Sequence, residues 1–251
     1  MINKSNLIKF GSAILTSLFI ASCDGGSDDS TTGPTSVTLN VSFEASGPIG
    51  FSSSFFFIHS GNLDLFDNGN ILADDLTELV ELGGVASLLN GTTLADGVFD
   101  NGRFVLEIAP GDIASSPDRI GNLVVSMENR YFTYFTTANP SNDTFSGNDN
   151  PLEFDLYQMI LDSPDGTVTI EVTELYDAGT EVNDFLTSDG NEFIAGLPEG
   201  DPEAGEDENG VITLHTPTFY DEYLNPGDFD VSTLNPNGAV VARITITIEE
   251  Q

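Results

Sequence analysis

The feature that most limits the fold of this chain is the alternation of apolar and polar residues in several short runs. The runs occupy residues 37–43, 104–108, 123–127, 152–156, 168–172 and 240–248. Successive side chains of a β-strand point to opposite faces, so each run places one face in a core and the other in water. Turn-forming Asn-Gly and Asp-Gly pairs at 68–69, 101–102, 165–166 and 209–210 separate the runs. The pattern predicts an all-β antiparallel sandwich.

One segment departs from the period of two. Apolar residues recur there at helical spacing, and two glycines follow: Leu72, Leu76, Leu79, Val80 and Gly83-Gly84. We predict a short helix in a loop between strands, with its leucines packed against a sheet. The expected fold class is therefore an antiparallel β-sandwich with one or two short helices in loops.

The N-terminal residues indicate export. Lys4 and Lys9 precede or flank an apolar run at 10–20 that is too short to span a bilayer comfortably. The sequence Ile20-Ala21-Ser22-Cys23 then resembles the bacterial lipobox, in which the cysteine is diacylated and becomes the new N-terminus. The alternatives are an ordinary signal peptide or an uncleaved anchor. Because Cys23 is the only cysteine, disulfides within one molecule are excluded.

These patterns predict three parts of the chain. Residues 1–22 form a lipoprotein signal peptide, and residues 23–35 form a flexible tether rich in Gly, Ser, Asp and Thr. Residues 36–251 form one β-sandwich domain, since no second linker of similar length follows. The expected location is the bacterial cell envelope, facing the periplasm or the outer membrane, and held to the membrane only through the lipid on Cys23.

The charge of the chain is strongly negative. The formal net charge is −35, and it becomes −37 once Lys4 and Lys9 are removed, because no other lysine exists. Such a surface repels nucleic acid and anionic lipid headgroups, so neither is an expected partner. It attracts divalent cations without specificity and is tolerated best at high salt. Most of the 41 Asp and Glu residues are accounted for by a solvated, salt-adapted surface, so a single acidic pair is weak support for a site.

Three polar stretches could carry chemistry: 139–150, 177–181 and 200–208. The first is too polar and too rich in turn formers for a strand, so we predict a loop at one end of the sandwich. In the second, Asp177 and Glu181 flank an Ala-Gly turn after a strand whose parity fails at Glu174-Leu175. That failure predicts a bulge or the exit of the strand. Calcium prefers six to eight oxygen ligands, and spacing alone does not choose a third carboxylate between Asp143 and the acidic loop 200–208.

A family resemblance makes that choice. The segments 131–134, 140–149, 176–181, 207–211 and 241–245 are similar to the spondin N-terminal domain family, of the F-spondin and mindin type, in a bacterial lipoprotein form. The resemblance covers nearly all of the chain after the tether. It implies a C2-like β-sandwich with one structural calcium ion, and it points to Asp143, Asp177 and Glu181 as the metal ligands. Glu181 replaces the Asp of the animal members, and Thr144 stands where they have Trp.

The sequence contains no motif of a known catalytic class. A Gly-x-Ser-x-Gly elbow, a His-Glu-x-x-His pair and a phosphate-binding glycine loop are all missing. His59 and His215, which both follow strand-like runs, are interpreted as side chains that satisfy hydrogen bonds at strand ends. The favoured function is a non-catalytic binding or adhesion module with an extracellular or periplasmic protein or glycan as partner. The alternatives are a carbohydrate-active enzyme or carbohydrate-binding protein that uses its acidic loops, and a salt-adapted structural protein without metal.

Overall fold

The structure is a computed structural model that describes residues 35–46, 49–74, 76–77, 80, 99–109, 111–115, 120, 122–139, 143–180, 208–215 and 240–249. All of them fall within one compact unit, Thr35–Gln251. The predicted signal peptide, the tether up to residue 34 and Cys23 lie outside the described residues. The boundary predicted between tether and domain therefore stays a prediction.

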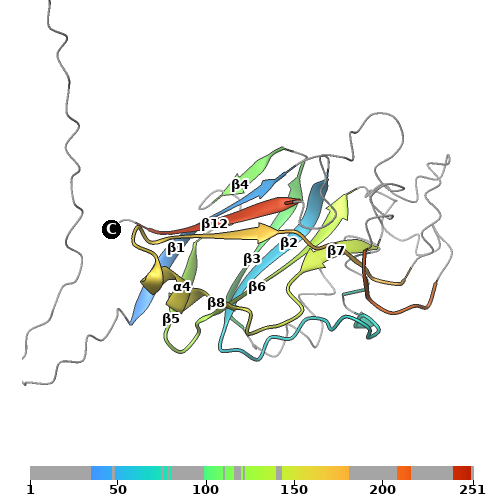
Figure 1. The fold of residues 1–251 in the computed structure, drawn as a ribbon, viewed down its shortest axis with the longest axis horizontal. Helices are drawn as coiled ribbons and strands as arrows, with labels where there is room; N and C mark the ends of the chain where they lie inside the picture. Colours follow the sequence, from blue (N-terminus) through green and yellow to red (C-terminus); the bar gives the residue numbers. More distant parts are fainter. Residues whose placement is uncertain are drawn as a thin grey trace, which may run out of the picture. The chain divides into compact units, whose positions relative to one another are not determined.

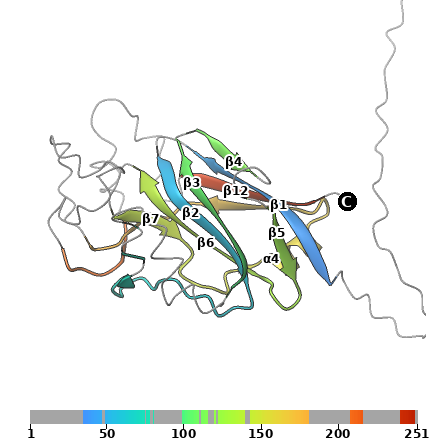
Figure 2. The ribbon, with the colours of Figure 1, turned by 180° about the vertical axis from the view of Figure 1, so that it is seen from behind.

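Two antiparallel sheets pack against each other (Figures 1 and 2). The first sheet has the order β4 (Ile113–Ser115), β1 (Ser36–Ala45), β12 (Ala242–Ile248) and β9 (Thr167–Val172), and β5 (Leu123–Ser126) also pairs with β1. The second sheet has the order β11 (Thr213–Leu214), β10 (Tyr176–Asp177), β7 (Thr144–Gly147), β6 (Tyr131–Asn139), β2 (Gly50–His59) and β3 (Phe99–Ile108). In it, β8 (Phe154–Asp155) also pairs with β6. The predicted all-β antiparallel sandwich is confirmed.

The main hydrophobic core lies between the two sheets. The first sheet contributes the inward residues of its alternating strands, among them Leu39, Val41, Phe43, Ile244 and Ile246. The second contributes Phe51, Phe56, Ile58 and Phe132. The rings of Phe43, Phe51 and Phe56 meet edge to face at 5.3 and 5.6 Å between centroids. Burial of each such side chain contributes about 1.5–3 kcal/mol relative to exposure, so the alternating pattern decides which face turns inward.

The second sheet also has an apolar cover on its other face. Residues of β2, β6, β7 and β10 on that face pack against the segment 63–80 in a second cluster: Phe55, Phe57, Phe135, Phe145, Tyr176, Leu63, Leu65, Phe66, Leu72, Leu76 and Val80. Phe66 is central, with Phe145 and Tyr176 at 4.9 and 5.1 Å between ring centroids. The unbroken apolar run 55–58 of β2 follows from this arrangement, because its residues are buried on both faces.

The predicted packing of the 72–80 segment is confirmed for its described residues. Asp74, Leu76, Thr77 and Val80 have helical backbone, and Leu72, Leu76 and Val80 are buried against the sheet. Leu79 and Gly83-Gly84 lie outside the described residues.

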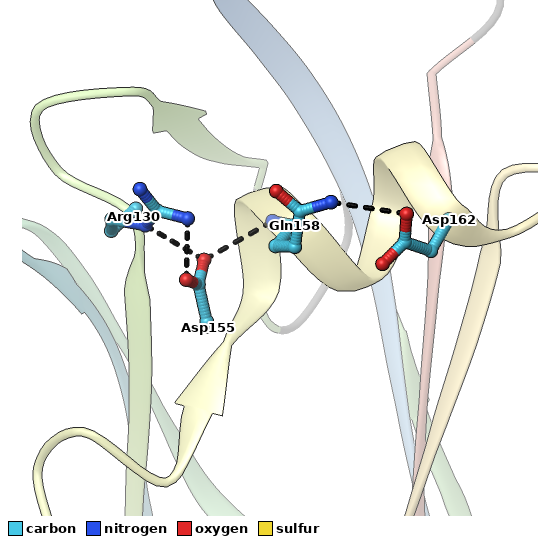
Figure 3. Close-up of polar contacts among 4 residues, drawn as sticks. All are labelled: Arg130, Asp155, Gln158 and Asp162. Carbon is cyan, nitrogen blue, oxygen red and sulfur yellow. Dashed lines mark hydrogen bonds and ion pairs between the residues drawn. The ribbon is translucent and has the colours of Figure 1, made fainter.

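The predicted strand at 152–156 is wrong except at Phe154 and Asp155. Only Phe154 and Asp155 pair in the sheet, and Leu156–Asp162 forms helix α4. Asp155 is the N-cap, since its carboxylate accepts a hydrogen bond from the Gln158 amide at 3.1 Å. Arg130 also holds that carboxylate, with Nε donating to Oδ1 at 2.8 Å and Nη2 close to Oδ2 (Figure 3). The helix is therefore fixed at its first turn to the start of β6.

The chain changes sheets where the strand parity fails. β9 ends at Val172 in the first sheet, and β10 begins at Tyr176 in the second. Thr173, Glu174 and Leu175 make the crossing, so the exit of the strand predicted at Glu174-Leu175 is confirmed. As a result, Asp177 lies in the second sheet, at the end of β10.

Candidate functional site

The predicted loop 139–150 contains a strand, which corrects that prediction. β7 lies between β6 and β10, and all four of its residues are buried. Its polar side chains are buried because distant residues satisfy them. The Thr144 hydroxyl lies 3.1 Å from His215 Nε2, and Ser146 Oγ donates to the Glu174 carbonyl at 2.7 Å. Thr144, at the position where the animal members of the resembled family have Trp, thus pairs with His215, which follows β11 on the other side of β10.

β7 and β10 bring two predicted ligands to one place. Asp177 is opposite Thr144 in the register, and the Ala178 amide donates to the Asp143 carbonyl at 3.0 Å. Asp143 is only 1% exposed. The Asp177 carboxylate accepts a hydrogen bond from the Gly179 amide at 2.6 Å, which fixes the turn that follows β10.

The last residue of the acidic loop joins the same place. The Glu208 amide donates to the Thr180 carbonyl at 2.9 Å, and the Gly210 amide donates to the Gly179 carbonyl at 2.6 Å. Burial, with a further contribution from the negative charge of Asp177, raises the pKa of the Glu208 carboxyl. Spacing alone leaves Asp143 and the acidic loop as alternatives, and in the structure the backbone of each lies next to the Asp177 turn.

Glycine is required where these two loops cross. Gly179 has φ +69°, and a Cβ there would lie 2.7 Å from both the N and the O of Val211. The backbones therefore approach more closely than any other residue would permit. Next to this crossing, Thr180 Oγ1 is buried and forms no hydrogen bond within the described part of the chain.

The segments that meet at the Asp177 turn carry side chains with oxygen atoms. Asp143, Asp177 and Glu208 supply carboxylate oxygens, which calcium prefers, and Thr180 adds a buried hydroxyl. Glu181, the third predicted ligand, lies outside the described residues. Among the residues that the structure does describe, no group of three or more His, Cys, Asp or Glu is close enough to hold a metal ion.

Both histidines sit at strand ends, with ring nitrogens in hydrogen bonds. His59, the last residue of β2, accepts from the Gly61 amide at Nδ1 (3.0 Å), and its Nε2 lies 2.9 Å from Thr133 Oγ1. Burial lowers the pKa of His59 to about 4 and that of His215 to about 3. Both rings are therefore neutral at physiological pH, in keeping with the interpretation as hydrogen-bonding residues.

Comparison with known proteins leaves the family open. No protein-family profile matches the chain, and no curated protein matches it. In the described part of the structure, no helix has the length and apolar character needed to cross a membrane. Cys23, the predicted lipidation site, lies outside that part.

Proposed function

We propose that this chain is a lipid-anchored, non-catalytic binding or adhesion module of the bacterial cell envelope, related to the spondin N-terminal domain. One calcium ion joins the loop that follows β6 to the turn that follows β10. Asp143, Asp177 and Glu181 are its ligands, and Cys23 carries the lipid. The ion orders one end of the sandwich, and that end faces a protein or glycan partner outside the membrane.

The observation that supports this proposal is that the backbones of three acidic segments, far apart in the sequence, meet at the Asp177 turn. Asp143 is almost fully buried, and its backbone carbonyl accepts a hydrogen bond from the Ala178 amide of the turn at 3.0 Å. Asp177 lies on β10, which pairs with β7 directly after Asp143. The negative charge of Asp177 helps to raise the pKa of Glu208, which belongs to a third segment. A divalent cation would neutralise this repulsion, and Glu181 is four residues beyond Asp177 in the chain.

Calcium should therefore raise the melting temperature. At about 1 mM calcium and a dissociation constant of about 10⁻⁴ to 10⁻³ M, the gain in unfolding free energy is about 0.4–1.4 kcal/mol. For a domain of this size that gain corresponds to about 1–5 °C. We expect a chelator to reverse the shift and Asp177→Asn to abolish it, both measured by thermal unfolding of the full chain.

Two further variants make the test specific. Asp143→Asn keeps the shape of the buried side chain and should also abolish the response to calcium. Glu128→Gln removes the same charge from an exposed turn between β5 and β6, and it should respond like wild type. If wild type, Asp177→Asn and Glu128→Gln all respond alike, only the diffuse acidic surface binds calcium.

The non-catalytic part of the proposal has its own test. Purified protein is incubated with a panel of polysaccharides, and both bound protein and released reducing sugar are measured. Retention without sugar release fits a binding module, whereas release of reducing sugar identifies a carbohydrate-active enzyme. Removal of the domain from intact cells by external protease would show that it faces outward.

A further inference from the structure

Strand β9 forms an edge of the first sheet. Its six residues pair with β12 on one side, and no described strand pairs with the other side. The Thr167 amide and carbonyl point to that outer side, because both are hydrogen-bonded to the Ser163 hydroxyl, at 3.0 and 2.8 Å. Backbone groups alternate along an antiparallel strand, so those of Thr169 and Glu171 point outward as well.

The outer groups of Thr169 and Glu171 are accessible. Both residues are exposed, and among the described residues none forms a hydrogen bond with the outer side of the strand at these positions. Edge strands are commonly protected by proline, lysine, a bulge or a covering element. The strand Thr167–Val172 contains neither proline nor lysine, and its register with β12 is regular.

The sequence of this edge is nearly its own reverse. Residues 167–173 read Thr-Val-Thr-Ile-Glu-Val-Thr, and reversal about Ile170 exchanges only Thr169 and Glu171. Two antiparallel copies centred on Ile170 would match valine with valine and threonine with threonine. Cross-strand pairs of β-branched residues are favourable, and a two-fold axis relates such strands in a closed dimer.

We propose that β9 is a homodimer interface, at which a second copy of this chain adds its own β9 antiparallel to the first. Thr169 lies opposite the second copy's Glu171, and the reverse pair is equivalent by symmetry. Each of these two pairs exchanges two backbone hydrogen bonds. The Ser163 hydroxyl already occupies the Thr167 backbone, so it ends the interface on that side and sets the register.

The charged residues near the edge are compatible with the register centred on Ile170. Glu171 forms an ion pair with Arg243 of its own chain at 3.4 Å, and it faces a neutral threonine of the other copy. The neighbouring outward residues of β12, Thr245 and Thr247, are uncharged. Glutamates would face each other in a register centred on Glu171, and the register centred on Ile170 avoids this. The self-complementary sequence is what favours a second copy over a strand from another protein.

The net charge of −35 makes dimerisation dependent on salt. Two copies repel at low ionic strength, and the screening length falls to about 3 Å at molar salt. We expect the full chain with Cys23→Ser, which removes the lipidation site, to sediment as a monomer at low salt and increasingly as a dimer as sodium chloride is added.

Charge variants at the edge test the register. Thr169→Glu places like charges opposite each other twice and should raise the dissociation constant about tenfold. Thr169→Lys should lower it, because each lysine faces a glutamate of the other copy. Thr245→Glu and Thr245→Lys make the same charge changes one strand inward, so they serve as controls and should differ little from wild type.

Two results would overturn the proposal. One is a wild-type chain that stays monomeric at every salt and protein concentration. This result would overturn the proposal even if β9 bound a strand of another protein. The other is a dimer that responds equally to changes at Thr169 and at Thr245. If Thr169→Glu failed to fold, Thr169→Lys would still test the register, because we expect it to dimerise more tightly than wild type.

Discussion

Acid should weaken this fold through His59, whose side chain is fully buried at the end of β2. Nδ1 accepts a hydrogen bond from the Gly61 amide, so the ring proton is on Nε2, which donates to Thr133 Oγ1. Protonation would place a second N–H on Nδ1, facing the Gly61 amide, and would bury a charge. Burial accordingly lowers the pKa of His59 from 6.5 to about 4.

The sign and size of the effect follow from proton linkage. Between about pH 6.5 and pH 4 the unfolded chain binds a proton at His59 and the folded chain does not. The free energy of unfolding therefore falls as the pH falls through this range. The contribution of His59 is fully present above pH 6.5, and about 3 kcal/mol of it is lost by pH 4, at about 1.4 kcal/mol per pH unit.

The assay compares urea unfolding of wild type and His59→Asn at pH 7, 5.5 and 4 at constant salt. Asparagine keeps an acceptor near the Gly61 amide but does not titrate. Asp64 and Glu153 have a raised pKa and gain stability in acid, but they do so equally in both proteins. The stability difference between the two should change by about 3 kcal/mol from pH 7 to pH 4. Parallel pH profiles would refute this account of His59.

Gly179 and Asp155 give two further predictions about stability. Gly179→Ala places a methyl group against the Val211 backbone at positive φ, so we expect urea unfolding to show a loss of about 1–3 kcal/mol. A change within about 0.5 kcal/mol would mean that the 179–211 crossing is not tight. Asp155→Ala removes the N-cap of α4 and the Arg130 ion pair and should cost about 1–2 kcal/mol. Arg130→Ala, which keeps the cap, should cost less, and an equal cost would contradict the assigned capping role.

Strand alternation predicted much of this fold because it reports directly on burial. The runs at 37–43 and 168–172 are strands with alternating burial, and the parity failure at 174–175 coincides with the change of sheet. Pairing order was beyond this reasoning, since alternation assigns faces and not neighbours. The partners of β1 come from segments as distant as 242–248.

Two of the errors have different physical causes. β7 was missed because Thr144 and Ser146 look like loop residues until distant partners satisfy their hydroxyls. Helix α4 was missed because Leu152 and Phe154 fit a period of two. The capping Asp155, with apolar residues one and five positions later, was the available signal of a helix start.

The candidate site was only partly within reach of sequence reasoning. The structure places Asp143, just before β7, next to Asp177 at the end of β10, and Glu181 lies outside the described residues. Glu208 ends the acidic stretch 200–208, but its place beside Asp177 depends on the pairing of β10 with β11. The turn Glu208-Asn209-Gly210 directly before a strand was the sequence signal that favoured it.

The pairing of β1 with β12 has a consequence for synthesis. Ala45 is opposite Ala242, so roughly 200 residues must be made after β1 before its central partner exists. At about 5–20 residues per second this takes about 10–40 s. Throughout that time one edge of β1 has no β12 to pair with it. We expect the high negative charge of the chain to keep unfinished copies apart by repulsion until β12 pairs with β1.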